Sequence, residues 1–172
     1  MGGASGLGRE TAILLANNRS YVTIADIQSR EQTVEELKSN GHNAQYVQCD
    51  VTSWDSQVKA FQSALAFSQN KTLDIVAIFA GIDSQGHLID HATSISSSID
   101  GLNPRIREIQ VNLIGALYTA TLGLHYSKLG SQETRKSLII VSCLAGYLDD
   151  THNSIYTTSK FGLRGLFRAI RA

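Results

Sequence analysis

Short apolar runs alternate with longer polar segments of helical spacing along this chain of 172 residues. Four of the apolar runs have the length of strands and are rich in β-branched residues. The third of them, "LDIVAIFAG", is apolar on both faces, which is typical of a strand inside a parallel sheet. The pattern predicts buried strands within residues 20–26, 44–50, 73–81 and 137–146.

The segments between these runs have the spacing of helices. The first after the opening glycines ends at Gly41, a residue suited to a helix C-cap, and the next begins with a Thr/Ser pair suited to an N-cap. The longest has Asn103 as its N-cap and Pro104 at its first position, and it is apolar on most sides. We therefore predict helices at 29–41, 52–68, 103–130 and 156–171, besides one directly after the glycines. Strands that alternate with helices predict an α/β fold with a doubly wound parallel sheet.

Composition narrows the class of protein. The length favours one domain over residues 1–172, and 42% hydrophobic residues can form a substantial core. Lys+Arg and Asp+Glu both number 15, so charge gives no reason to expect nucleic acid or an anionic membrane as a partner. The two cysteines, Cys49 and Cys143, have no metal-site or disulfide spacing. We expect no metal, no membrane span and a cytoplasmic location.

The opening "GGASGLGRETAILLA" carries candidate binding chemistry. Gly2, Gly6 and Gly8 form a G-x-x-x-G-x-G pattern directly before a helix, where backbone N–H groups can hold a pyrophosphate. Alone, the pattern is equally compatible with an ordinary glycine-rich turn. Asp26 strengthens the first interpretation, because it ends the next strand where an acidic side chain binds the adenosine ribose of NAD. Its charge, and the absence of Lys or Arg from the loop around Ser5, favour NAD over NADP.

The roles of the two acidic residues at strand ends each have a second interpretation. Asp26 is also typical of a turn after a strand. Asp50 ends the following strand, and the sequence favours equally an adenine contact and a turn that leads into the helix after Thr52.

Tyr156 and Lys160 offer catalytic chemistry near the end of the chain. A tyrosine hydroxyl has a pKa of about 10, too high for a base near neutral pH. Residues four apart share a helix face, so the ammonium group of Lys160 is expected to lower the pKa of Tyr156. An oxidised nicotinamide ring would add a second positive charge, and Tyr156 would then be a usable acid/base. Such pairs are also common on solvated helices. Ser142, at the end of the last strand, and Asn112, in the long helix, supply the context that favours a site.

These motifs together resemble those of the short-chain dehydrogenase/reductase family, over the whole chain and in the family's order. The resemblance implies a Rossmann-type domain, a nicotinamide cofactor, and oxidation of an alcohol or reduction of a carbonyl. It implies Tyr156 as general acid/base, Ser142 as the donor that orients the substrate oxygen, Lys160 as the residue that binds ribose and tunes Tyr156, and Asn112 as the holder of a relay water. The implied cofactor-binding residues are Gly2, Ser5, Gly6, Leu7, Gly8, Asp26, Asp50, Val51, Ala80, Gly81, Tyr156 and Lys160.

The resemblance also implies partners. A small-molecule alcohol or ketone is the expected substrate, and helices 103–130 and 156–171 are the expected interface of a homodimer or homotetramer. A second hypothesis is a catalytically silent chain that binds nucleotide weakly or only associates with other subunits. Another Rossmann protein, such as a methyltransferase, explains the glycines but leaves Ser142, Tyr156 and Lys160 unexplained.

The chain departs from the family at both ends. Family members carry a strand before the first glycine, between the strands expected at 20–26 and 73–80, and further strands after the Tyr–Lys helix. Met1 occupies the place of a family threonine. The simplest hypothesis is that the chain is a fragment, an alternative transcript or a mispredicted gene product. Cys143 is expected to point into the core, without a redox role.

Overall fold

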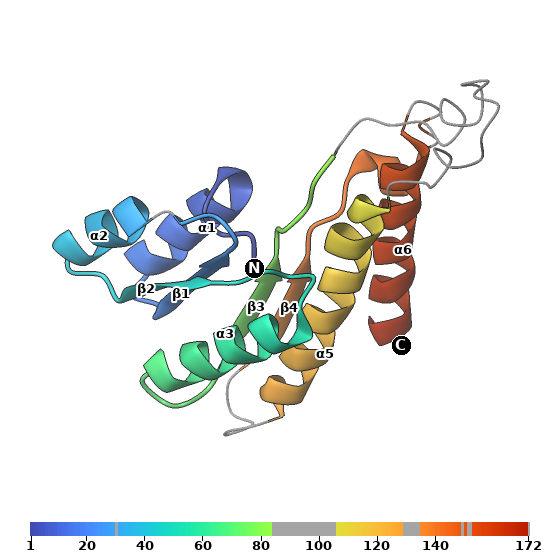
Figure 1. Cartoon of the computed structure of the whole chain (residues 1–172). Coiled ribbons are helices and arrows are strands. Elements are labelled where there is room, and N and C mark those ends of the chain that lie inside the picture. Colours follow the sequence, from blue (N-terminus) through green and yellow to red (C-terminus); the bar gives the residue numbers. More distant parts are fainter. Residues whose placement is uncertain (30, 84–105, 129–134, 149, 151–152, 172) are drawn as a thin grey trace. The chain divides into compact units, whose positions relative to one another are not determined.

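The structure is a computed structural model that describes residues 1–29, 31–83, 106–128, 135–148, 150 and 153–171 (Figure 1). These residues form two compact units, each described here by itself. The first unit comprises Met1–Ala80 and Gly115–Val141, and the second comprises Gly81–Ile114 and Ser142–Ala172. That residues 1–172 are one domain stays a prediction.

The first unit contains four strands and four helices among its described residues, and the strands confirm the predicted α/β class. Strands β1 (Val22–Asp26) and β2 (Ala44–Gln48) pair in parallel, as do β3 (Ile75–Ile78) and β4 (Ser137–Ile140). The helices are α1 (Gly6–Asn17), α2 (Glu31–Ser39), α3 (Trp54–Phe67) and α5 (Gly115–Ser127). Each strand lies inside its predicted segment but is shorter than that segment.

Apolar packing holds α1 and α2 against the β1–β2 sheet. Ala12 and Ala16 of α1, Ile24 of β1, and Val34 and Leu37 of α2 are buried in one cluster. The small alanine side chains let α1 approach the strand closely, and burial of these residues supplies the hydrophobic stabilisation of this layer. The end of α2 is confirmed as well, because the turn after it uses a glycine with φ of +79° at position 41.

A buried polar side chain joins α3 to α5. Gln57 is fully buried, and its side-chain amide donates hydrogen bonds to the carbonyl oxygens of Val51 and Gly115, at 2.7 and 2.8 Å. Its own carbonyl oxygen accepts a hydrogen bond of 2.7 Å from the hydroxyl of Thr119. Every hydrogen-bonding group of the Gln57 amide thus has a partner, as burial of a polar group requires.

The chain start lies between the two pairs of strands. The amine of Met1 donates a hydrogen bond of 2.8 Å to the carbonyl oxygen of Ala77, and the Met1 carbonyl accepts one from the N–H of Phe79. The N–H of Gly2 donates to the carbonyl of Ala25, at 2.8 Å. The first peptide group therefore bridges β3 and the end of β1, as one residue of a strand between them would do.

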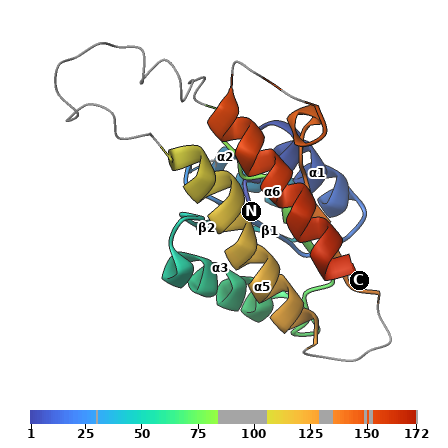
Figure 2. The ribbon, with the colours of Figure 1, turned by 90° about the vertical axis from the view of Figure 1, so that its right-hand side faces the viewer.

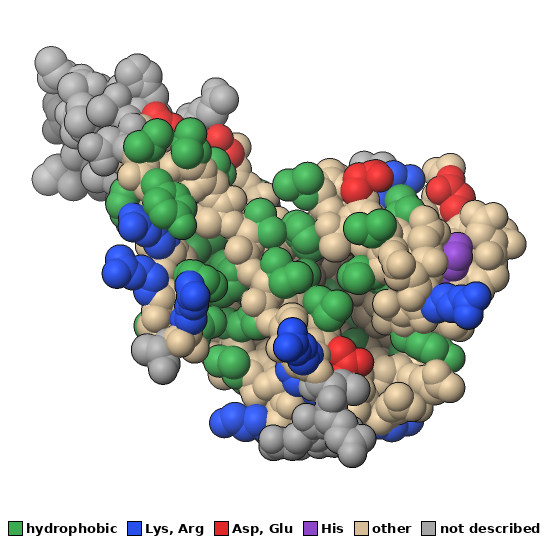
Figure 3. Space-filling model, turned by 180° about the vertical axis from the view of Figure 1, so that it is seen from behind, with side chains coloured by type: hydrophobic (Ala, Val, Ile, Leu, Met, Phe, Trp, Pro, Cys, Tyr) green, Lys and Arg blue, Asp and Glu red, His purple; other side chains and the backbone are tan. Residues whose placement is uncertain are grey.

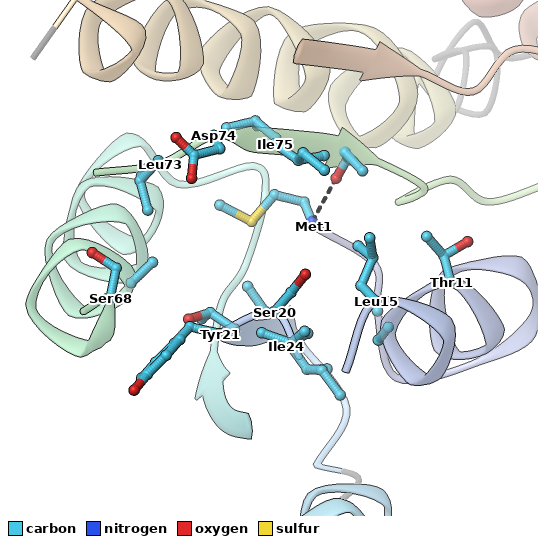
Figure 4. A pocket seen from close by; sticks show the side chains of 18 of the residues that line it. Met1, Thr11, Leu15, Ser20, Tyr21, Ile24, Ser68, Leu73, Asp74 and Ile75 are labelled. Atoms are coloured by element: carbon cyan, nitrogen blue, oxygen red, sulfur yellow. Dashed lines mark hydrogen bonds between the residues drawn. The ribbon is translucent and has the colours of Figure 1, made fainter. Parts of the chain in front are cut away.

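A cavity of about 370 Å³ continues from Met1 between β1 and β3 (Figure 4). The side chains of Leu15, Tyr21, Ile24 and Leu73 contribute to its lining. No strand lies between β1 and β3 among the described residues, so their facing edges are not joined by a ladder. The cavity lies where the family resemblance predicts a strand before the first glycine.

The β3–β4 sheet has one covered face. Val76 and Leu138 pack against Gly123 of α5, whereas Ile75 and Ile139 on the opposite face are 46% and 43% exposed. Figure 3 shows apolar side chains gathered on the surface seen from behind the view of Figure 1. The residues of β3 are apolar on both faces as predicted, but Val76 is half-buried whereas Ile75 on the other face is exposed.

Among its described residues, the second unit contains a π-helical segment (Ile109–Ile114), a short 3-10 turn (Leu144–Gly146) and helix α6 (Ser154–Arg171). Helix α6 packs against both of the other elements (Figure 2). It confirms the predicted helix 156–171 and begins two residues earlier. The predicted caps Asn103 and Pro104 lie outside the described residues. None of the helices in the described part of the chain has the length and apolar character needed to cross a membrane.

Candidate active site

Asn112 is fully buried in the π-helical segment of the second unit. Its amide nitrogen donates hydrogen bonds to the carbonyl oxygen of Ile82, at 2.9 Å, and to the hydroxyl of Ser159, at 3.0 Å. Its amide oxygen accepts one from the N–H of Ile82, at 2.8 Å. The side chain therefore fixes the backbone at Ile82 to α6. Its predicted role in holding a water stays a prediction, and the fully engaged amide shows that the side chain positions its neighbours.

Tyr156 and Lys160 lie on α6, one turn apart as predicted. The ammonium nitrogen of Lys160 is 5.3 Å from the centroid of the Tyr156 ring. Lys160 is only 6% exposed, and a Cβ atom at Gly81 would lie 3.5 Å from its nitrogen. Within the described residues, no carboxylate pairs with this ammonium group and no acceptor takes a hydrogen bond from it. A buried cation of this kind is poorly satisfied until a ligand supplies oxygen atoms.

The surroundings of Tyr156 in the chain alone favour its neutral form, and the lowering of its pKa by Lys160 together with an oxidised nicotinamide stays a prediction. Burial raises the pKa of Tyr156 to about 12, and the nearby Cys143 acts in the same direction. Burial also lowers the pKa of Lys160. In the chain alone, the loss of hydration therefore favours the neutral phenol form of Tyr156.

Ser142 and Cys143 are adjacent but have different surroundings. The hydroxyl of Ser142 donates a hydrogen bond of 3.4 Å to the backbone carbonyl of Lys160. The thiol of Cys143 is exposed, and the side chain of Tyr156 is near enough to influence its pKa. The prediction that Cys143 points into the core is therefore wrong. The N–H of Ala145 and then Tyr156 lower the pKa of the Cys143 thiol, because both stabilise the thiolate.

The glycine loop belongs to the first unit and has two positions that only glycine fits. Gly2 has φ of +75°, and a Cβ atom there would lie 2.3 Å from the backbone nitrogen of Ala80. A Cβ atom at Gly8 would lie 2.1 Å from the carbonyl oxygen of Gly2. Ser5 occupies the N-cap of α1 but makes no side-chain capping hydrogen bond. The first N–H groups of α1 are thus left without a side-chain cap, and Leu7 beside them is exposed.

The two strand-end carboxylates differ in their contacts. Asp26 accepts hydrogen bonds from the N–H groups of Ala4, at 2.9 Å, and Gln28, at 3.0 Å, so it ties the glycine loop to the end of β1. Asp50 accepts from both the N–H and the hydroxyl of Thr52, at 2.9 and 2.8 Å. For Asp50, these contacts favour the turn that leads into α3.

The structure thus brings the predicted residues together in two groups. The second unit holds Gly81, Asn112, Ser142, Tyr156 and Lys160, and the first unit holds Gly2, Ser5, Gly6, Leu7, Gly8, Asp26, Asp50, Val51 and Ala80. The sequence analysis did not identify Ser159. Its sequence context is that of any helical serine, and only the contact with Asn112 in the structure indicates its role. Cys143 was placed in the core, and no signal in the sequence indicated its contact with Tyr156. The described residues contain no cluster of His, Cys, Asp or Glu that could hold a metal ion.

Comparisons with known proteins identify the class to which this fold and these residues belong. The profile of the short chain dehydrogenase family matches residues 1–172, and the chain therefore belongs to this family. It is 45% identical to a "5'-hydroxyaverantin dehydrogenase" of Dothistroma septosporum, over 99% of this chain and 60% of that protein. It is 34% identical to an "NADP-dependent dehydrogenase" of Cochliobolus lunatus, over 99% of this chain and 62% of that protein.

Solved structures show the same fold. An actinorhodin polyketide ketoreductase with NADPH has a TM-score of 0.81 at 21% identity, over 98% of this chain and 61% of that one. A 3-oxoacyl-[acyl-carrier protein] reductase from Brucella melitensis has a TM-score of 0.79 at 20% identity, over 98% of this chain and 65% of that one. The chain spans about 60% of the length of the two curated relatives from Dothistroma septosporum and Cochliobolus lunatus.

Proposed function

We propose that the protein is an oxidoreductase that uses a nicotinamide dinucleotide and an alcohol or carbonyl substrate. The observation that carries this proposal is the buried ammonium group of Lys160, which lies beside Tyr156 and Gly81 without a partner among the described residues. A ribose offers hydroxyl oxygens that satisfy such a group. The membership in the family supports the same class of reaction.

The residues present fit this cofactor. The absence of side chains at Gly2 and Gly8 lets the loop fold tightly against its own backbone at the start of α1, whose N–H groups attract negative charge such as that of a phosphate. When bound, the nicotinamide supplies the hydride chemistry. Gly81 and Lys160 would face its ribose, and Asp26 would face the adenosine ribose, with Asp50, Val51 and Ala80 as further predicted contacts.

Tyr156 is the proposed general acid/base. As a neutral phenol with a pKa raised to about 12, it can donate its proton to a carbonyl oxygen that becomes an alcohol. In the opposite direction it accepts a proton from an alcohol only when its pKa falls. The ammonium of Lys160 and a positively charged oxidised nicotinamide would lower it together. Asn112 holds the Tyr156 helix in place through Ser159.

The sequence and the relatives support different cofactors, NAD and NADP. Asp26 carries a negative charge at the end of β1, which favours NAD because it would repel the additional phosphate of NADP. The names of two relatives, of Cochliobolus lunatus and of a Phoma species, state NADP dependence and weaken the prediction of NAD. We propose NAD for this chain on the charge of Asp26, with Asp26→Asn expected to improve the affinity for NADP relative to NAD.

Turnover and binding test the proposal separately. The chain is mixed with NADH or NADPH and a ketone, or with NAD or NADP and 5'-hydroxyaverantin, and the reduced cofactor is followed by absorbance. Binding is measured by calorimetry on the same samples. We expect binding, and turnover that Tyr156→Phe lowers by about 10²-fold or more. Binding without turnover would support the catalytically silent alternative, and the absence of both would contradict the proposal.

We also propose self-association through helices, because α6 exposes Phe161, Phe167 and Ile170, and α5 exposes Leu117 and Leu124. Exposed apolar residues of this size on a helix are typical of an interface. Phe161→Glu with Phe167→Glu is expected to shift the mass measured by light scattering to that of a monomer. A parent chain that is monomeric at high concentration would contradict this.

A further inference from the structure

We propose that Cys143, and not Ser142, is the side chain that shares the substrate oxygen with Tyr156. This inference rests on the proposed function of Tyr156 as acid/base. It assigns a second group at the reacting oxygen and replaces the serine that the resemblance implies with a thiol.

Ser142 is turned toward backbone. Its hydroxyl donates to the carbonyl oxygen of Lys160, and a Cβ atom at Gly146 would lie only 2.9 Å from that hydroxyl oxygen. The hydroxyl therefore packs between α6 and the 3-10 turn. The hydroxyl is directed at a main-chain acceptor 3.4 Å away, so it would have to rotate to face a substrate.

The side chain of Cys143 points away from the backbone that Ser142 contacts. Its backbone is extended, with φ of −149° and ψ of 167°, directly before the turn Leu144–Gly146. Adjacent side chains of an extended backbone point in opposite directions, so Ser142 and Cys143 cannot both face the same group. Cys143 is the exposed one of the two, and its sulfur is near enough to the Tyr156 side chain for Tyr156 to lower the pKa of the thiol. A substrate oxygen that reaches Tyr156 thus meets the Cys143 thiol as its neighbour.

Cys143 and Tyr156 influence each other's protonation. The N–H of Ala145, and then Tyr156, stabilise negative charge on the sulfur, and the nearby sulfur favours the protonated form of Tyr156. A bound carbonyl oxygen would accept a hydrogen bond from Tyr156. The thiol would then be a weak donor to that oxygen, weaker than the hydroxyl of a serine. We therefore expect Cys143→Ser to keep or raise kcat and Cys143→Ala to lower it.

Thiol alkylation tests the contact without any need for turnover. The rate of reaction of the full chain with iodoacetamide is measured against pH. The second cysteine, Cys49, is buried and has a raised pKa, and Cys49→Ser removes its contribution. Tyr156→Phe is expected to shift the midpoint of Cys143 alkylation to higher pH and to slow the reaction at neutral pH. Thr158→Ala, on the exposed side of the same helix, serves as the matched control and should leave the profile unchanged.

Activity completes the test. We expect Cys143→Ala to lower kcat by about tenfold or more, a loss typical of a missing donor at the reacting oxygen, while Cys143→Ser does not. Unchanged alkylation in Tyr156→Phe with a native circular dichroism spectrum would overturn the inference. So would a loss of kcat in Ser142→Ala larger than that in Cys143→Ala. If no variant turns over any substrate, the proposed function fails, whereas alkylation still decides whether Cys143 faces Tyr156.

Discussion

The amide of Asn112 donates a hydrogen bond of 3.0 Å to the hydroxyl of Ser159, which in turn donates one of 2.6 Å to the carbonyl oxygen of Tyr156. Because Asn112 also holds both backbone groups of Ile82, a continuous chain of hydrogen bonds runs from the residue after Gly81 to the first turn of α6. The position of Tyr156 therefore depends on a buried side chain of the π-helical segment.

The first prediction concerns this chain of hydrogen bonds. Asn112→Ala leaves the backbone groups of Ile82 and the hydroxyl of Ser159 without their buried partner, and it is expected to lower the free energy of unfolding by about 2 to 3 kcal/mol. Urea denaturation followed by circular dichroism measures the change. Asn17→Ala, at an exposed position of α1, is the control and should change stability by less than about 0.5 kcal/mol. Equal effects of the two substitutions would contradict the structural role of Asn112.

A second prediction follows from the environment of Tyr156. With its pKa raised to about 12, its phenol should ionise after those of the exposed tyrosines when the chain is titrated. Phenolate absorbance of the parent minus that of Tyr156→Phe isolates this group among the six tyrosines. An oxidised nicotinamide cofactor is expected to lower the midpoint. A midpoint at or below 10 in the chain alone would show that Lys160 outweighs burial.

The sequence predicted the order of the elements, because that order depends on local pattern, whereas the site residues stay predictions. Gly2, Gly8, Tyr156 and Lys160 are recognisable from spacing and residue type. The contacts of Cys143 depend instead on which way one extended residue points, and spacing does not determine that. The raised pKa of Tyr156 in the chain alone was not predicted for a related reason, since sequence reveals a neighbouring charge but not how much water burial removes.

The burial of Gln57 is a feature of the fold that the sequence did not reveal, and it gives a third prediction. A glutamine in a helical pattern is usually exposed, yet its amide is buried with three hydrogen-bond partners. Gln57→Leu is expected to destabilise the chain by about 1 to 3 kcal/mol, because the carbonyl groups of Val51 and Gly115 lose their donor. Thr119→Val and the double variant complete a cycle, and the two effects should be less than additive. Strict additivity would show that the hydrogen bond between Gln57 and Thr119 contributes nothing.

The glycine loop gives a fourth prediction with a matched control. Alanine at Gly8 forces a Cβ atom to within 2.1 Å of the Gly2 carbonyl, whereas alanine at Gly165 of α6 meets no atom within 4 Å. Gly165→Ala is expected to stabilise the chain by about 0.5 to 1 kcal/mol through helix propensity. Gly8→Ala should destabilise it and weaken cofactor binding, measured by calorimetry. Normal binding by Gly8→Ala would show that this close approach does not shape the cofactor site.

The fifth prediction concerns the amine of Met1, for the chain produced with Met1 as its first residue. Burial lowers the pKa of this amine from its ordinary value of 8.0, while it donates a hydrogen bond to Ala77. Above pH 8.0 the amine is neutral in both the folded and the unfolded chain, so burial costs nothing there. As the pH falls below 8.0, the unfolded chain takes up the proton first, and the free energy of unfolding decreases until the pH passes below the pKa of the folded chain.

Acetylation of Met1 isolates this effect, because an acetylated nitrogen keeps its N–H for Ala77 but does not titrate. The difference in free energy of unfolding between the acetylated and the free chain is measured by urea denaturation from pH 6 to pH 9. The acetylated chain should gain stability relative to the free chain as the pH falls below 8.0. All other titrating groups are common to the two chains and cancel in the difference. A difference that stays constant over this range would show that the amine is hydrated in the folded chain and does not lie buried between β1 and β3.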